Sequence, residues 1–315
     1  MPGLCSKILT FLIFLRHPHL KSPYRYFLRF YYIGHFNQLK YFIRDRILRK
    51  PYKEIRFFGE FQQELLYVLP FAYWHYKNGT LKRTISSLHT KDLYFFSPDH
   101  REEFKTRRWL GNYTLEFPHG PHAFRISEMR WKQVPLKSYY RNDRFVYDKP
   151  LLILANRYNS EWDEPPKSFF SLEILEVLIN KLKSKYQIIY NRPTAGQIVN
   201  DNSKILTLND YKWMRKNHPE VKLLQDIYKQ KIVKVNGFNH LQLMVYANAD
   251  HFISVHGGTA ALASYFGGKN VIYSQKGFEH PLDEFKNVFP KLSGTKIYLC
   301  RTESELISSV SREFL

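Results

Sequence analysis

The sequence predicts an α/β fold made of two Rossmann-like units, preceded by a basic aromatic arm. Apolar strands alternate with helical segments between residues 151 and 273, which is the pattern of a doubly wound parallel sheet. The run LLILA at 151–155 is continuously apolar, as expected for a strand buried on both faces of such a sheet. A shorter strand–helix pattern precedes it, between 54 and 97.

The first unit is expected over 51–148. Gly59 marks the turn from its first strand into a helix, and the stretch 100–148 is rich in Arg, His and Pro and predicts no regular element. The expected elements are strands at 54–58, 81–87 and 92–97 and a helix at 60–76.

The second unit is expected over 149–315 and begins at Lys149-Pro150. Its first helix carries apolar residues at helical spacing, at Leu172, Leu175, Leu178, Ile179 and Leu182. The expected elements are strands at 151–155, 186–190, 231–235, 251–255 and 270–273, and helices at 171–184, 241–249 and 259–266.

Residues 1–50 form the basic aromatic arm, with ten Lys or Arg against the single acid Asp45. The whole chain has a net charge of +20, which favours anionic partners without choosing among nucleic acid, acidic lipid and phosphorylated substrates. One predicted helical face carries Phe36, Leu39, Ile43 and Ile47. Such a helix either lies in a membrane interface or packs on the protein with its cations solvated; we favour the membrane.

Composition and cysteine usage predict a folded cytoplasmic protein, attached peripherally to the inner face of the plasma membrane. The apolar run 8–15 is too short to cross a bilayer, which takes roughly 20 residues. No small-residue cleavage site follows it, so a secretory leader is not favoured. Cys5 and Cys300 lie at opposite ends and form no metal or disulfide pattern, which indicates a reducing compartment.

The most informative stretch is FISVHGGTAALASYFGGKNVIY at 252–273. A strand runs into His256-Gly257-Gly258-Thr259 where a helix begins, which is where ligands bind in parallel sheets. The glycines permit close approach, Thr259 is expected to cap the helix, and the helix start favours a phosphate. The stretch matches neither the dinucleotide nor the P-loop fingerprint, and a tight turn without a ligand is the alternative.

With these residues in view, the second half of the chain resembles the donor-binding domain of GT-B glycosyltransferases, in particular uncharacterised members from bacterial surface-polysaccharide (capsule or LPS) gene clusters. The matching pieces cover about 165 residues, while the match of 57–90 to the acceptor domain of these families is weaker. They are LLILANRYNSEW at 151–162, YQIIYNRP at 186–193, FNHLQLMVYANADHFISVHGGTAALASYFGGKNVIY at 238–273 and KGFEH at 276–280.

The resemblance implies a transferase that moves a sugar from a nucleotide-sugar donor, bound in a cleft between two Rossmann-like domains, to a surface glycan or its lipid-linked precursor. It places the donor phosphates at His256, Gly257, Gly258 and Thr259, and the donor ribose or sugar at Glu279. Many retaining members carry a second Glu eight residues further on, where this chain has Asn287, so the stereochemical outcome stays open.

Three further residues are expected at the donor site because they follow strands. Asn156 and Arg157 follow 151–155, and Arg192 follows 186–190. The two arginines are expected to stabilise the departing diphosphate in place of a metal, although each alone is also compatible with a solvated surface position. Since no DxD motif and no metal-ligand spacing occurs, we expect no metal and no cofactor besides the donor; Glu161-Trp162 is a weaker site element.

A base near the acceptor hydroxyl is required for inverting transfer. Glu60 is the candidate because it follows Gly59 at the first strand-to-helix turn, although acids at helix starts also serve simply to satisfy the helix dipole. Weaker rivals are His89, Asp99, His119 and His122.

Other function classes remain as alternatives. Cations interleaved with aromatics in the arm can hold nucleic acid, but no nucleic-acid-binding motif occurs and the charge is concentrated outside the folded units, so we expect no nucleic-acid partner. A GT-B-like sugar-nucleotide epimerase shares the fold and differs in its product with donor alone. A binding protein without turnover is the third alternative.

Overall fold

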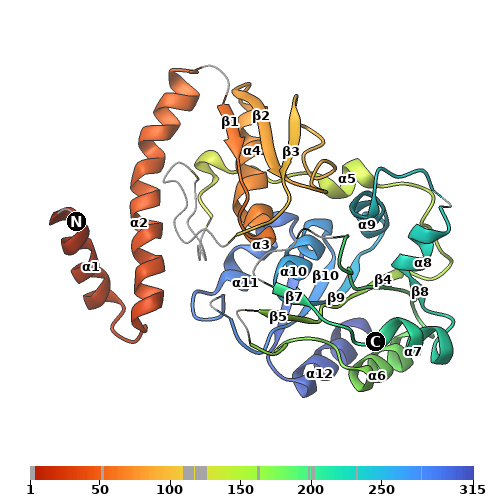
Figure 1. Cartoon of the computed structure of the whole chain (residues 1–315). Coiled ribbons are helices and arrows are strands. Elements are labelled where there is room, and N and C mark those ends of the chain that lie inside the picture. Colours follow the sequence, from red (N-terminus) through yellow and green to blue (C-terminus); the bar gives the residue numbers. More distant parts are fainter. Residues whose placement is uncertain are drawn as a thin grey trace.

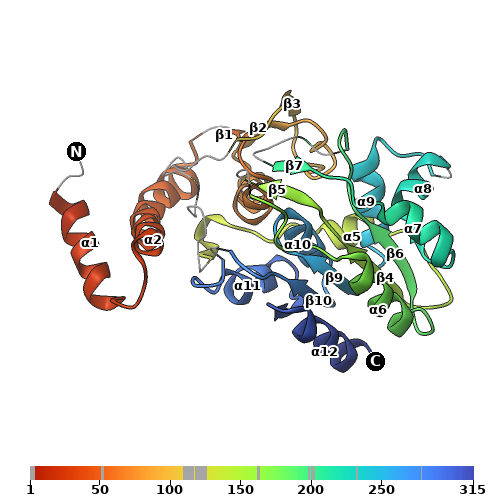
Figure 2. The ribbon, with the colours of Figure 1, turned by 60° about the horizontal axis from the view of Figure 1, so that its bottom comes forward.

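The computed structural model describes residues 4–50, 53–108, 117, 126–161, 164–197, 199, 203–231, 233–277 and 279–315. Two parallel sheets with their covering helices form the body, and two helices form an arm at its side (Figures 1 and 2). The structure therefore confirms an α/β fold with parallel sheets.

The larger sheet has six parallel strands in the order β11-β10-β9-β4-β6-β8. Four of them, β4, β6, β9 and β10, lie within a residue of the predicted positions. In register, Ala155 of β4 lies beside Asn191 of β6 and Ser254 of β9, so the three strands end at the same edge. The strands are β4 (Leu151–Ala155), β6 (Gln187–Asn191), β8 (Lys222–Leu223), β9 (His251–Val255), β10 (Lys269–Tyr273) and β11 (Lys296–Cys300).

Helices cover both faces of this sheet. On one face lie α6 (Leu172–Leu182) and α12 (Glu303–Phe314), and α6 begins where the Ser171 hydroxyl accepts a hydrogen bond from the Ile174 amide. On the other face lie α9 (Phe238–Tyr246) and α10 (Gly258–Ala263), which continues as a 3-10 turn at 264–266. The remaining elements of this half are α7 (Asp210–Asn217), α8 (Leu224–Lys229), α11 (Glu284–Asn287), a 3-10 turn at Phe289–Leu292, and the antiparallel pair β5 (Asn159–Glu161) and β7 (Ser203–Ile205).

Two predicted strands are wrong. Residues 92–97 form successive turns, and the third strand of the smaller sheet is β3 (His100–Phe104). Residues 233–235 carry no strand either, and the short strand β8 occupies the edge beside β6. In the segment 92–97, Leu93 and Phe96 are buried and anchor the turns. The apolar residues of this segment therefore predicted its burial correctly. They did not predict its conformation, because a strand forms only where a neighbouring strand pairs with it.

The smaller sheet has three parallel strands, β1 (Lys53–Arg56), β2 (Leu81–Ser87) and β3. Between β1 and β2 runs one helix in three pieces: α3 (Phe61–Gln63), a π-helical turn at Glu64–Val68 and α4 (Leu69–Lys77). Residues 63–75 of this helix are all buried, which requires packing on every side.

The helix 61–77 joins the two halves of the body. It packs on the smaller sheet and also on α10, so apolar residues between Ile55 and Leu292 form one continuous core across both halves. The predicted boundary near 148 falls just before β4, in an exposed stretch between the core residues Phe145 and Leu151. The division into two domains stays a prediction.

The arm consists of α1 (Leu4–Arg16) and α2 (Ser22–Phe42), which ends in a π-helical turn at Ile43–Ile47. It is anchored by Arg130, a fully buried residue of the 3-10 turn Glu128–Arg130, whose guanidinium donates to Asp45 at 2.7 Å and to Gln38 at 3.0 Å. A short helix, α5 (Leu136–Tyr140), then leads toward β4. Within the part of the chain that the structure describes, none of the helices combines the length and the hydropathy needed to cross a bilayer.

Candidate functional site

The order of the larger sheet places its topological switch point between β4 and β9. From β4 the chain proceeds outward through β6 to β8, whereas β9 is followed on the opposite side by β10 and β11. Ligands of open parallel sheets bind in the crevice at the carboxyl ends of the two strands that flank such a point. Here those ends carry Asn156-Arg157 and His256-Gly257.

Arg157 bridges the two strand ends. Its Nη1 donates a hydrogen bond of 3.3 Å to the carbonyl oxygen of His256. Asn156 is fully buried, and its carboxamide donates to Phe170 O and Tyr190 Oη and accepts from two backbone amides, one of them that of Arg157. Asn156 was predicted to contact the donor; in the structure its side chain fixes the start of the segment that carries Arg157.

The glycines of the first turn allow close contacts from two directions. Gly257 has a φ of +91°, and a Cβ on it would lie 2.6 Å from Nη1 of Arg157. A Cβ on Gly258 would lie 2.7 Å from the ring of Phe61, which comes from the other half of the body. At Gly268 a Cβ would clash with the carbonyl of Asp250, so the second Gly-Gly serves packing.

The predicted cap at Thr259 is wrong, because Gly257 is the N-cap residue of α10 and no side chain caps the helix. Thr259 instead lies half-buried in the first turn. The first N–H groups of a helix have no partner within that helix, so the start of α10 offers donors at the switch point.

The start of helix 61–77 closes the site from the smaller sheet. Glu60 is the N-cap residue of α3, and its side chain makes no capping hydrogen bond to that helix. Two residues on, Gln62 Nε2 donates to Glu279 Oε1 at 3.3 Å, and Glu279 is 6% exposed. The structure thus brings Glu60, Glu279 and the 256–259 turn into one region.

Two histidines of this region are held neutral. Burial, the Arg157 guanidinium and His280 lower the pKa of His256 well below its usual value. Burial and Arg301 lower the pKa of His280, against the effect of Glu279. The Nδ1 atoms of both rings are buried and have no hydrogen-bond partner among the residues that the structure describes.

The hydrogen bonds of the Arg192 side chain go to Asp210 and Leu206 and not to the glycine turn 256–259. It is 5% exposed and forms a two-pronged ion pair with Asp210, at 2.5 and 2.6 Å, and Asp210 also accepts from Tyr190. Hydrogen bonds to Asp210 raise the pKa of this guanidinium further, although burial acts in the opposite direction. The side chain therefore braces the loop after β6.

The weaker site elements fall elsewhere. Glu161 belongs to β5, whereas Trp162, His119 and His122 lie outside the described residues. The His89 carbonyl accepts from Asn239, and Asp99 pairs with Arg83 at 3.2 Å.

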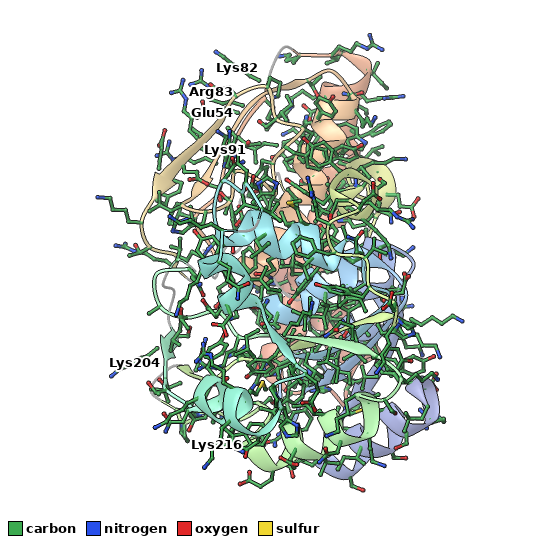
Figure 3. All side chains as sticks on the ribbon, turned by 90° about the vertical axis from the view of Figure 1, so that its right-hand side faces the viewer. Glu54, Lys82, Arg83, Lys91, Lys204 and Lys216 are labelled. Atoms are coloured by element: carbon green, nitrogen blue, oxygen red, sulfur yellow. The ribbon has the colours of Figure 1, made fainter. Side chains whose placement is uncertain are left out.

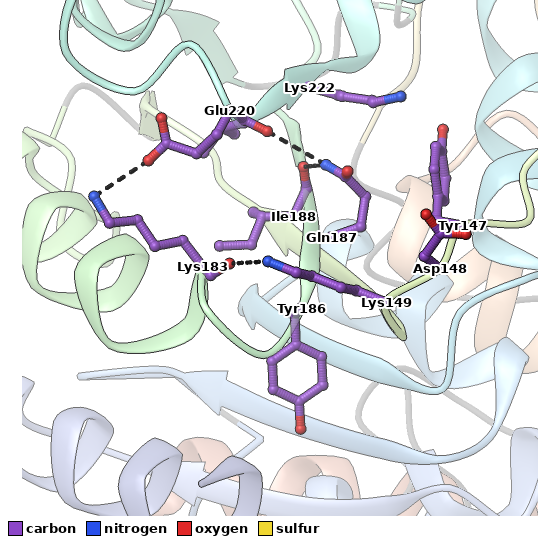
Figure 4. A pocket seen from close by; sticks show the side chains of 10 residues that line it. Tyr147, Asp148, Lys149, Lys183, Tyr186, Gln187, Ile188, Glu220 and Lys222 are labelled. Atoms are coloured by element: carbon purple, nitrogen blue, oxygen red, sulfur yellow. Dashed lines mark hydrogen bonds and ion pairs between the residues drawn. The ribbon is translucent and has the colours of Figure 1, made fainter.

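Two cavities, and no cluster of metal ligands, occur among the residues that the structure describes. Over the described ranges, no three His, Cys, Asp or Glu side chains are placed to hold a metal ion together. One cavity of about 370 Å³ lies where β4, β6 and β8 begin, the opposite edge of the sheet, and Lys149, Lys183 and Glu220 line it (Figure 4). A second of equal volume lies beside Phe58 and Arg108, next to the turn that carries Glu60.

Charges on the body are dispersed. The labelled cations run from Lys82, Arg83 and Lys91 at one end to Lys204 and Lys216 at the other (Figure 3). Some of these charges are balanced, since Arg83 pairs with Glu54 at 3.7 Å as well as with Asp99.

Sequence reasoning missed Phe61, Gln62 and His280 as members of the site. Phe61 and Gln62 directly follow Glu60, and His280 directly follows Glu279, so adjacency to a predicted site residue was the available signal.

The fold and the site define a doubly wound α/β protein whose switch point is lined by an arginine and a glycine turn. Among solved structures, the chain is similar to the crystal structure of the bacterial iron-containing dodecameric glycosyltransferase TibC from enterotoxigenic E. coli H10407, at 13% identity and a TM-score of 0.44. The similarity covers 80% of this chain and 63% of that one, less than two thirds of its length. No family model and no curated protein matches the chain.

Proposed function

We propose that the chain is a glycosyltransferase that moves a sugar from a nucleotide-sugar donor to a surface glycan or its lipid-linked precursor. The observation that carries the proposal is the meeting of Arg157 with the His256–Thr259 turn at the switch point of the sheet. A cation held beside the N–H groups at a helix start suits the diphosphate of a nucleotide, because each group interacts with phosphate oxygens.

The other residues of the region have assigned roles in this proposal. Glu279 accepts hydrogen bonds from hydroxyl groups of the ribose or the donor sugar. Glu60 removes the proton of the acceptor hydroxyl while the oxygen of that hydroxyl attacks the anomeric carbon of the donor sugar. The bond from that carbon to the diphosphate breaks, and Arg157 stabilises the negative charge of the departing nucleoside diphosphate.

The remaining predicted residues have supporting roles. Asn156 and Arg192 hold the loops that form the walls of the site, since their polar atoms bond within the protein. His256 holds Arg157 at the donor site through its carbonyl oxygen. We propose that a metal is not required, because Arg157 supplies positive charge at the leaving group.

A thermal-shift panel of UDP, GDP, CDP, ADP and CMP, with and without EDTA, tests the donor site. One nucleotide at a hundredfold excess over its Kd stabilises the fold by about 2.7 kcal/mol, a Tm shift of about 5 °C. Arg157→Gln abolishes the shift, whereas Arg141→Gln, which removes an exposed charge, preserves it.

Two results would count against this proposal. If no nucleotide stabilises the wild-type protein, the donor site is wrong. If the shift disappears with EDTA, metal independence is wrong while the donor site stands.

A further inference from the structure

The arm presents an apolar surface to solvent that no described part of the chain covers. On α1, Leu9 and Ile13 face inward. They form a small cluster with Phe27 and Leu28 of α2 and with Leu282 of the body. The opposite side is equally apolar and is 51 to 76% exposed, at Leu4, Ile8, Phe11, Leu12 and Leu15. These five recur at the i, i+4, i+7, i+8, i+11 spacing of one helical face.

A second exposed apolar run lies on α2, as a continuation of the line that packs toward α1. One line of apolar side chains at intervals of three and four residues runs from Tyr24 to Ile47. Its first part, Tyr24, Leu28 and Tyr32, belongs to the cluster with α1. Its second part is bare, at Phe36, Leu39, Ile43 and Ile47, and Phe36 is 83% exposed. We call the five α1 residues and these four residues the outward stripe.

Within the arm itself, the exposed charges are of one sign. Asp45, the single acid of residues 1–50, is buried and paired with Arg44 and Arg130. Although burial raises it, the hydrogen bond from Arg44 and the charge of Arg130 lower the pKa of Asp45 overall, so this carboxylate stays paired. The exposed cations of the arm are Lys7, Arg16, Lys21, Lys40, Arg46, Arg49 and Lys50.

We propose that the outward stripe docks on the surface of an anionic lipid bilayer. Isolated apolar side chains are ordinary on a protein surface, but nine exposed ones concentrated on two packed helices are typical of an interaction site. The exposed cations of the arm complement lipid phosphates, and apolar side chains insert between head groups. A helix that lies in the interface needs no spanning length. This proposal is independent of the transferase function.

Flotation of the full-length protein with phosphatidylcholine vesicles, with and without phosphatidylglycerol, tests the proposal. The wild type partitions to the vesicles that contain phosphatidylglycerol, and high salt weakens this binding. Combined Ile8→Ser, Phe11→Ser and Leu15→Ser lowers the partition coefficient at least about tenfold. Combined Lys7→Gln, Lys21→Gln and Lys40→Gln lowers the partition coefficient by a similar factor on vesicles that contain phosphatidylglycerol. This variant does not change the partition coefficient on vesicles of phosphatidylcholine alone.

A matched control replaces three exposed apolar residues outside the arm, with Val146→Ser, Val177→Ser and Leu315→Ser, and leaves vesicle binding unchanged. Circular dichroism and Tm verify that each variant folds. The proposal fails if the wild type stays unbound, or if the α1 serine variant binds as well as the control. The proposal also fails if light scattering shows that the wild type is a dimer and the α1 serine variant a monomer, while neither protein binds vesicles. The stripe would then join two copies of the chain.

Discussion

Arg107 and Glu64 form a buried ion pair directly behind the turn that carries Glu60. Nη2 of Arg107 lies 2.6 Å from Oε2 of Glu64, and the two side chains are 3% and 0% exposed. The same guanidinium donates to Gly59 O at 2.9 Å and lies 5.2 Å from the ring centre of Phe61. One side chain therefore fixes the chain on both sides of Glu60, and the position of the candidate base depends on a residue of another segment.

Glu64→Gln is expected to lower the free energy of unfolding by about 3–5 kcal/mol, because it leaves the Arg107 guanidinium buried without its counter-charge. Urea unfolding measures this loss. The control Glu103→Gln removes the exposed partner of Arg56 and costs at most about 1 kcal/mol. Equal losses in the two variants would show that the buried pair does not stabilise the turn.

Gly258→Ala is expected to destabilise the protein by about 1–3 kcal/mol, since the new methyl group meets the Phe61 ring. In a Phe61→Ala background the penalty disappears, which a double-mutant cycle measures. Gly34→Ala in α2 is the control: its Cβ meets no atom within 4 Å, and the substitution stabilises the helix by about 0.5–1 kcal/mol. A penalty at Gly258 that persists without Phe61 would contradict the proposed contact between the two halves.

His75 makes the stability of the protein dependent on pH. Burial and the nearby Arg130 lower the pKa of His75 to about 3, against Asp45, whereas the unfolded value is 6.5. The unfolded state therefore binds an extra proton between these values. The stabilising contribution is complete above pH 6.5 and falls by up to about 1.4 kcal/mol per pH unit as the pH drops toward 3.

Replacement of His75 by Gln is expected to flatten this part of the curve of unfolding free energy against pH. Thr80→Val is the matched control, since it removes the hydroxyl 2.8 Å from Nδ1 and leaves the imidazole in place. It lowers stability at every pH and keeps the slope. If wild type and His75→Gln have the same slope, His75 is not a source of the acid sensitivity.

Glu60→Gln is expected to separate binding from turnover. The variant keeps the Tm shift from the preferred nucleotide, and transfer from the corresponding nucleotide-sugar falls by about 10²–10⁴-fold, the usual contribution of a general base. Product chromatography measures the rate, and Glu128→Gln on an exposed turn is the control. Undiminished transfer would exclude Glu60 as the base.

Local patterns were sufficient for the elements that build the switch point. The continuous apolar run at 151–155 and the helical spacing at 172–182 each identify an element without reference to the rest of the chain. Because parallel strands end at one edge, the positions of Arg157 and His256 followed from the strands alone.

Contacts that depend on distant segments could not be predicted. Phe61 has the pattern of an ordinary helix residue, and only the packing of helix 61–77 on α10 brings it to Gly258. Arg192 also looked available, because its partner Asp210 begins α7, a helix that was not predicted from the sequence. In both cases the missing information was a long-range pairing.

The shared core also bears on how the chain folds during synthesis. Helix 61–77 is buried partly by α10, which the ribosome makes about 180 residues later, roughly ten seconds or more at ordinary elongation rates. Until then the apolar side of this helix has no permanent cover. A nascent chain stalled before β9 is therefore expected to bind holdase chaperones, and release of the completed chain from them coincides with the closing of the crevice between Phe61 and Gly258.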